Sequence, residues 1–148
     1  MRLDTLTYQW KLQSQVTDFF SALLNEQLRY FQSKNDSIET IESGTRVHSY
    51  LQTKVNKQVV KSTIEIGTII PNKKLELITQ HAHGKILQTY QIHTTENGTN
   101  FVSYSETNEL KQMKSQLSLL FTLPIYKLIY NKSAKKRMQY LEMIVQNN

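Results

Sequence analysis

The chain has 148 residues, a formal net charge of +6 and no cysteine. This length fits a single domain with a core of its own, which needs neither a metal nor a disulfide to fold. The lack of cysteine excludes disulfides, thiol nucleophiles and thiolate-bound metals.

The first predicted elements are a strand and a helix. Apolar side chains alternate with polar ones at the start of the chain, as in a half-buried strand: Leu6, Tyr8, Trp10 and Leu12. Ser14 is a favourable N-cap residue, so we expect a helix to begin there. Apolar residues then recur on one helical face from Val16 to Phe31, before the polar loop Ser33–Asp36.

Period-two patterning returns after this helix. Six segments alternate in this way, with turn-forming residues between them: Ile38–Glu42, Thr45–Lys54, Gln58–Ile69, Lys74–His83, Lys85–Thr94 and Thr99–Glu106. Pro71–Asn72 breaks the chain between two of them, and Asn97–Gly98 is a strong hairpin signal. Gly67 lies inside one segment, where it predicts a bulge that bends the sheet. The segments therefore predict an antiparallel meander.

The last part of the chain predicts a long basic helix. The stretch Leu110–Leu141 has seven basic residues and no Asp or Glu, and its apolar residues recur near helical spacing. Asn108 is a candidate N-cap for this helix. Pro124 falls inside it and removes a backbone hydrogen bond, so we expect a kink there. Two helices joined at Pro124 fit the pattern almost as well.

Several short motifs resemble a known family. They are the strand through Tyr8 and Trp10, Ser14 with the Phe19–Phe20 pair, Tyr104–Ser105–Glu106, and Lys135–Lys136–Arg137 after an apolar run from Leu117. With the order strand, helix, six strands and long helix, they resemble the START-like (SRPBCC) helix-grip superfamily. Within it, the chain is most similar to a small uncharacterised bacterial family of unknown function.

The resemblance implies an α+β helix-grip fold in one START-like domain over residues 1–148. A curved antiparallel sheet of about six to seven strands would surround a long kinked C-terminal helix. In this superfamily a cavity commonly lies between the sheet and that helix. The family has no known activity, so the resemblance implies no catalytic residue.

Few residues form a pattern typical of catalysis or metal binding. His81 and His83 are two apart on a predicted strand, so both face one side, but a stable metal site needs a third or fourth ligand. We therefore expect no metal and no cofactor. Glu106, at the end of a strand, and His81 are the candidate polar groups of the cavity. For Glu106 the alternative is an ordinary surface acid.

Aromatic residues on the predicted strands favour a ligand-binding site. Tyr and Trp present an apolar wall with a polar handle, which suits an amphipathic or aromatic ligand. Five aromatic residues are expected to form the wall of the site: Tyr8, Trp10, Tyr90, Tyr104 and Phe121. The leading hypothesis is non-enzymatic binding of a small hydrophobic or amphipathic molecule. A filled core with no ligand is the alternative.

Other functions stay open. The apolar run Leu117–Tyr130 is wider than one helical stripe, and the basic cluster Lys132–Arg137 that follows is predicted to be mostly solvated. The surplus apolar residues could pack against the first helix, or they could contact a partner protein, a second copy in a homodimer, or a membrane surface. A cyclase- or hydrolase-like enzyme is the third hypothesis, and nucleic acid is disfavoured because the helix would cover the strand-borne aromatics. The chain starts without a secretory signal, so we expect a cytoplasmic protein.

Overall fold

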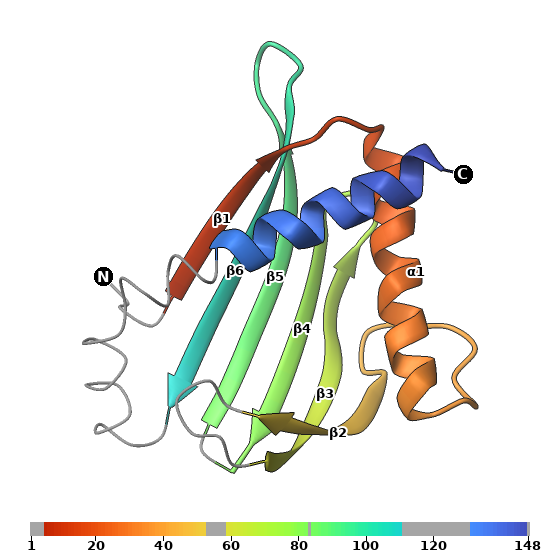
Figure 1. The fold of residues 1–148 in the computed structure, drawn as a ribbon, viewed down its shortest axis with the longest axis vertical. Helices are drawn as coiled ribbons and strands as arrows, with labels where there is room; N and C mark the ends of the chain where they lie inside the picture. The colour runs from red at the N-terminus through yellow and green to blue at the C-terminus, as the bar shows by residue number, and fades with distance from the viewer. Residues whose placement is uncertain (1–4, 53–58, 83, 111–130, 148) are drawn as a thin grey trace.

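The structure is a computed structural model that describes residues 5–52, 59–82, 84–110 and 131–147. Its elements, in chain order, are β1 (Thr5–Lys11), α1 (Val16–Lys34), β2 (Arg46–Gln52), β3 (Val59–Ile70), β4 (Lys74–His81), β5 (Gly84–Thr94) and β6 (Asn100–Leu110). Residues 131–146 are also helical, and we call them the C-terminal helix. Figure 1 shows this helix lying across one face of the sheet, with its end near α1.

The six strands form one antiparallel sheet in the order β1-β6-β5-β4-β3-β2. Strands β2 to β6 follow one another as a meander, and β1 pairs with β6 at the other edge. The first and last strands are therefore neighbours, which places Tyr8 opposite Tyr104. This arrangement of a curved sheet and a C-terminal helix confirms the predicted α+β helix-grip fold and its meander (Figure 1).

The helix α1 buries one apolar face, as its pattern predicts. Its buried side chains are Phe19, Phe20, Ala22, Leu23 and Phe31. The prediction that Ser14 caps this helix is wrong. The first helical hydrogen bond runs from the Phe19 N–H to the Gln15 carbonyl oxygen at 2.9 Å, so Gln15 is the N-cap and makes no side-chain cap bond. Ser14 lies one residue too early, and its buried Oγ has no partner among the described residues.

The prediction of a strand over Ile38–Glu42 is also wrong, because these residues form a loop. Contact with β3 begins only at Gly44, whose N–H donates to the Ile66 carbonyl oxygen at 2.8 Å. Before that point the segment has no neighbouring strand. Ile38 and Ile41 instead pack against the core from the loop. Their spacing reflects contact with the core rather than a pleated strand.

The predicted boundary between the last strand and the last helix is likewise wrong. β6 continues to Leu110, and Asn108 lies in its ladder opposite Ile86, so Asn108 is not a helix N-cap. Pairing with β5 provides hydrogen-bond partners for the backbone at Asn108, and this outweighs the preference of asparagine for a helix N-cap. Pro124 and its expected kink lie outside the described residues. No helix within the described parts of the chain is long and apolar enough to cross a membrane.

The sheet bends at Gly67, as predicted. The register between β3 and β4 shifts between Ile66 and Ile69, which marks a bulge. A Cβ at position 67 would lie 3.1 Å from the Cβ of Glu76 and 3.3 Å from Cδ1 of Ile78. Glycine therefore allows β4 to approach closely at the bend.

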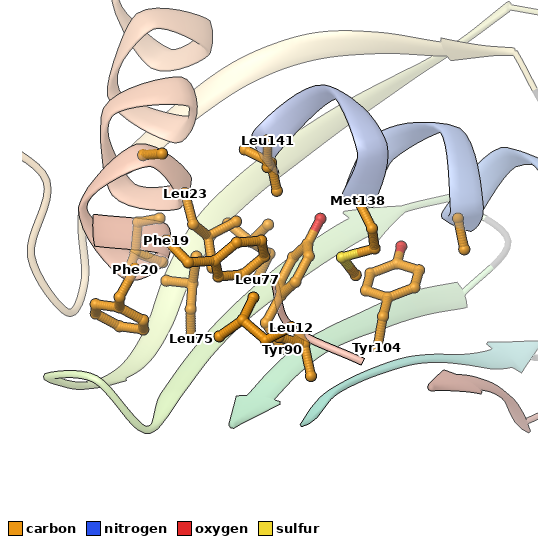
Figure 2. Packing of buried hydrophobic residues seen from close by; sticks show 14 of the residues in the cluster. Leu12, Phe19, Phe20, Leu23, Leu75, Leu77, Tyr90, Tyr104, Met138 and Leu141 are labelled. Carbon is orange, nitrogen blue, oxygen red and sulfur yellow. The ribbon is translucent and has the colours of Figure 1, made fainter. Parts of the chain in front are cut away.

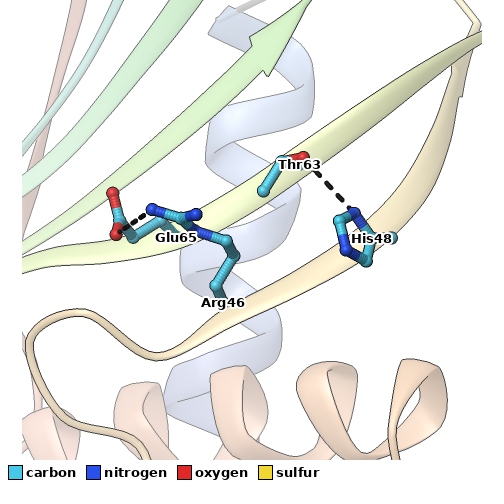
Figure 3. A network of polar contacts seen from close by, with 4 residues as sticks. All are labelled: Arg46, His48, Thr63 and Glu65. Atoms are coloured by element: carbon cyan, nitrogen blue, oxygen red, sulfur yellow. Dashed lines mark hydrogen bonds and ion pairs between the residues drawn. The ribbon is translucent and has the colours of Figure 1, made fainter.

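The outer face of the sheet carries polar contacts. Arg46 Nη2 donates to Glu65 Oε1 at 2.9 Å between β2 and β3 on this outer face (Figure 3). Beside this pair, Thr63 Oγ1 lies 3.4 Å from His48 Nδ1. Exposed ion pairs contribute only about 0–1 kcal/mol to stability. The stabilising contacts are therefore concentrated on the opposite, inner face.

Candidate functional site

The inner face of the sheet, which packs against the C-terminal helix, is arranged in rows by the strand register. The first two rows, which we call the aromatic half, contain Trp10, Val102 and Ile92, then Tyr8, Tyr104, Tyr90 and Leu75. The next two rows, which we call the mixed half, contain Leu6, Glu106, Gln88, Leu77 and Ile66, then Asn108, Ile86, Thr79 and Ile64. Polar groups therefore enter the inner face only beyond the tyrosine row.

Tyr90 and Tyr104 form the centre of the aromatic half (Figure 2). They are direct cross-strand partners with ring centroids 4.8 Å apart, and they are only 2% and 1% exposed. Met138 of the C-terminal helix points toward them, and Leu141 points into the same core. A pair of this kind contributes about 0.5–1.5 kcal/mol beyond the area it buries. The rings therefore join sheet and helix, and their hydroxyl ends make the polar contacts.

Arg137 of the C-terminal helix joins the two tyrosines. Its Nη1 donates a hydrogen bond to Tyr90 Oη at 3.2 Å, and its Cζ lies 4.9 Å from the centroid of the Tyr104 ring. The second contact is a cation–π interaction. The basic cluster is mostly solvated, as predicted, because Lys132, Lys135 and Lys136 are exposed, and Arg137 is the exception. Arg137 follows Ala134 by three residues and precedes Leu141 by four, and that spacing places it on the buried side of the helix.

The Tyr104 hydroxyl is the centre of a hydrogen-bond network. Gln88 Nε2 donates to Tyr104 Oη at 2.7 Å, and Tyr104 Oη donates to Glu106 Oε2 at 3.3 Å. The hydroxyl thus acts as acceptor and donor at once. Glu106 lies on the inner face, on the same side as Val102 and Tyr104, and its place at the mouth of a cavity stays a prediction.

The electrostatics of the cluster fix its protonation. Burial raises the pKa of Tyr90 and of Tyr104 above the usual value for tyrosine, and the Arg137 cation opposes this only in part. Burial alone would lower the pKa of Arg137, but the two adjacent tyrosines outweigh it and the pKa rises. At neutral pH the cluster therefore consists of two neutral hydroxyls beside a fixed positive charge.

Tyr8 and Trp10 lie on β1 and are partly buried against the core. Trp10 Nε1 donates to Glu142 Oε1 at 3.4 Å, and the same oxygen accepts the backbone N–H of Gln13 at 2.9 Å. Glu142 is only 5% exposed. Its buried carboxylate fastens the C-terminal helix to the chain that follows β1. Sequence reasoning missed this residue, because an acid near the end of a helix normally faces solvent.

The remaining predicted site residues lie apart from this cluster. His81 ends β4 opposite Gly84, on the inner face but one row beyond the mixed half. Phe121 and His83 lie outside the described residues. Within the part of the chain that the structure describes, no three His, Asp or Glu residues come together in a group that could hold a metal.

A surface groove of about 540 Å³ lies between α1 and the end of the C-terminal helix, away from the tyrosines. Its lining residues are Asp18, Ser21, Ala22, Asn25, Glu26, Leu28, Arg29, Ile144 and Val145. None of them was predicted as a site residue. Asp18 and Arg29 are exposed there, and Arg29 Nη1 pairs with Glu26 Oε1 at 3.2 Å.

Comparison with known families gives one match over most of the chain. A family model described as a domain of unknown function (DUF3284) matches residues 7–127. This agrees with the predicted likeness to an uncharacterised family. No curated protein matches the sequence.

Solved structures share the fold at low sequence identity. DynU16, a protein of the dynemicin biosynthetic locus, superimposes with a TM-score of 0.59 and 9% identity over 94% of this chain, which spans 47% of DynU16. Ara h 8.0201 and the protein MLL2253 from Mesorhizobium loti each give a TM-score of 0.58 and 13% identity, and the match covers 97% of this chain and 98% of the other. At these identities the likeness establishes the helix-grip fold alone.

Proposed function

The chain belongs to the family of the domain of unknown function DUF3284, and we propose that it binds a small amphipathic molecule in the cytoplasm without converting it chemically. The binding surface is the mixed half of the inner face, beside the C-terminal helix. The Tyr104 network carries this proposal, because Gln88, Tyr104 and Glu106 place polar atoms next to an apolar surface. In the START-like superfamily, which the chain resembles, a cavity commonly lies in this position.

The mixed half offers both kinds of contact that such a ligand needs. Ile64 and Ile86 are partly exposed apolar side chains. Gln88, Glu106 and Asn108 are partly exposed as well, and they supply hydrogen-bond donors and acceptors. Small-molecule sites are typically apolar surfaces with a few fixed polar groups. This composition supports an amphipathic ligand over a purely hydrophobic one.

The predicted wall residues take different parts in this proposal. The C-terminal helix already covers the rings of Tyr90 and Tyr104, so only their hydroxyls contact the ligand, at one end of the binding surface. Tyr8 and Trp10 continue the same rows onto β1. His81 provides a polar group beyond the opposite end of the mixed half.

Binding is favoured over catalysis by the protonation of the cluster. A general acid or base works best when its pKa lies near the working pH. Burial moves the pKa of Tyr90 and of Tyr104 further from neutrality, and Arg137 stays charged. The groups are suited to hold a ligand in place rather than to exchange protons with it.

An interaction surface is the second candidate function, and exposed residues of the C-terminal helix support it. Tyr140 and Met143 are three residues apart and are 45% and 50% exposed. Two large apolar side chains at this spacing lie on one side of a helix. This side of the helix could contact a partner protein, a second copy in a homodimer or a membrane surface.

Mass spectrometry of the natively purified protein tests the proposal. The protein is sprayed under non-denaturing conditions and then denatured, so that any bound molecule is released and identified. We expect one small amphipathic molecule per chain. The free protein mass alone, together with no saturable binding of decanoate, 1-decanol or decylamine, would refute ligand binding and leave the interaction surface as the better account.

A further inference from the structure

Arg137 is held at the border between the aromatic and the mixed half. Its guanidinium has five N–H donors in a planar fork. The guanidinium donates from Nη1 to Tyr90 Oη, and it also hydrogen-bonds the side chain of Tyr104, above whose ring its Cζ lies. The donors that these two hydrogen bonds leave over are what a ligand head group on the inner face would need.

Arg137 has no carboxylate partner among the described residues. The ion pairs there join Arg29 to Glu26, Arg46 to Glu65, and Lys74 to Glu76. Of the 12 acidic residues of the chain, only Asp4 lies outside the described residues, because the stretch 111–130 contains no Asp or Glu. Glu106 joins the cluster through the Tyr104 hydroxyl rather than through an ion pair with Arg137. A partly buried cation that no carboxylate contacts directly is costly to hold in place. A bound anion would remove that cost.

The choice of residue at this position points the same way. The neighbouring cations on the C-terminal helix are Lys132, Lys135 and Lys136, and all three are exposed. The cation that turns toward the sheet is an arginine. Arginine can donate two parallel hydrogen bonds to one carboxylate, whereas lysine acts as a point charge.

We infer that Arg137 binds the acidic head group of the ligand, which is an amphipathic monocarboxylate. This inference rests on the proposed binding function and adds the chemical class. The carboxylate lies at the border of the two halves, and the apolar tail extends over Ile86 and Ile64 of the mixed half. Glu106, which receives a hydrogen bond from Tyr104 on the same cluster, repels negative charge on the head group, and this repulsion is larger for the dianion of a phosphate ester than for a carboxylate. A monoanion is therefore preferred over a phosphate ester.

Four probes with ten carbons each separate the head group from the tail: decanoate, 1-decanol, decylamine and decyl phosphate. Their affinities are measured by calorimetry and by fluorescence of Trp10, the single tryptophan of the chain. Decanoate is expected to bind at least about tenfold more tightly than 1-decanol, as one charge-assisted hydrogen-bond pair implies. Decyl phosphate at pH 8 is expected to bind more weakly than decanoate.

Two variants test the assignment to Arg137. Arg137→Gln should lose the preference for decanoate but still bind 1-decanol, which also shows that its inner face is intact. Lys136→Gln removes the same charge from an exposed position of the helix and should keep the preference. Arg137→Lys keeps the positive charge but lacks the planar guanidinium, so it should retain only part of the preference for decanoate.

The outcomes separate the inference from the function on which it rests. If the unaltered protein binds decanoate and 1-decanol equally, or if Arg137→Gln keeps the preference, the inference is wrong while ligand binding stands. If no probe binds, ligand binding itself is wrong. If Arg137→Gln does not fold, the comparison of decanoate with 1-decanol on the unaltered protein and on Arg137→Lys decides the inference.

Discussion

Replacing Tyr104 with Phe removes one oxygen atom and leaves the ring in place. The change separates the role of the hydroxyl from the packing of the ring against Tyr90. The Gln88 amide loses the acceptor that it reaches at 2.7 Å, and the Glu106 carboxylate loses a donor at 3.3 Å. If the hydroxyl is the centre of the network, this variant destabilises the fold although it keeps the apolar core.

The size of the effect follows from the two bonds. A neutral hydrogen bond contributes about 0.5–1.5 kcal/mol, and one to a charged group about 1.5–3 kcal/mol. The bond to Glu106 is long, and both partners are partly exposed, so water replaces part of what is lost. We therefore expect the free energy of unfolding to fall by about 1–2 kcal/mol in Tyr104→Phe.

Urea unfolding followed by Trp10 fluorescence measures this change. The dependence of the unfolding free energy on urea should stay the same, because the surface exposed on unfolding is nearly unchanged. Tyr50→Phe is the matched control, since Tyr50 is 74% exposed, and it should stay within about 0.5 kcal/mol of the unaltered protein. A Tyr104→Phe variant as stable as this control would refute the network.

Three further predictions concern other parts of the structure. Above about pH 10, tyrosines of the unfolded chain ionise, whereas the raised pKa of Tyr104 keeps its proton bound in the folded state. The free energy of unfolding should therefore fall as the pH rises above about 10. Urea unfolding across pH measures this fall, and an equally steep fall in Tyr104→Phe would contradict the assignment to Tyr104. Gly67→Ala should cost about 1–3 kcal/mol, since its Cβ would lie 3.1 Å from that of Glu76, and an unchanged melting temperature would exclude the close approach. Glu142→Ala should cost about 1–3 kcal/mol because the Gln13 N–H loses its buried acceptor. Glu142→Gln keeps an acceptor oxygen and should lower the free energy of unfolding by less than Glu142→Ala. Equal decreases in the two variants, measured by urea unfolding, would show that the charge of Glu142 stabilises the fold rather than the hydrogen bond to Gln13.

The strands could be predicted because their periodicity is local. Alternation with a period of two fixes which side chains share a face, so Tyr104 and Glu106 could be placed on one side of their strand before their partners were known. The alternation within Ile38–Glu42 misled for a physical reason. A strand also needs a neighbour, and pairing with β3 begins only at Gly44.

The residues that sequence reasoning missed depend on where the C-terminal helix docks. Arg137 meets Tyr90, which is 47 positions away, and Glu142 meets Trp10, which is 132 positions away. Neither contact leaves a local signal, because each looks like an ordinary charge on a helix. Asn108 is a further example. Asparagine favours helix N-caps, but pairing with the distant strand β5 holds Asn108 in a strand, and the local sequence does not reveal that pairing.

The most direct test of ligand binding on the inner face is a nuclear magnetic resonance titration of the ¹⁵N-labelled protein with decanoate. Saturable shifts are expected at Gln88, Glu106 and Arg137, which surround the proposed head-group position. The outer-face residues Arg46 and Thr63 should stay unchanged. Shifts confined to the groove between α1 and the C-terminal helix, or no saturable shifts at all, would contradict the account.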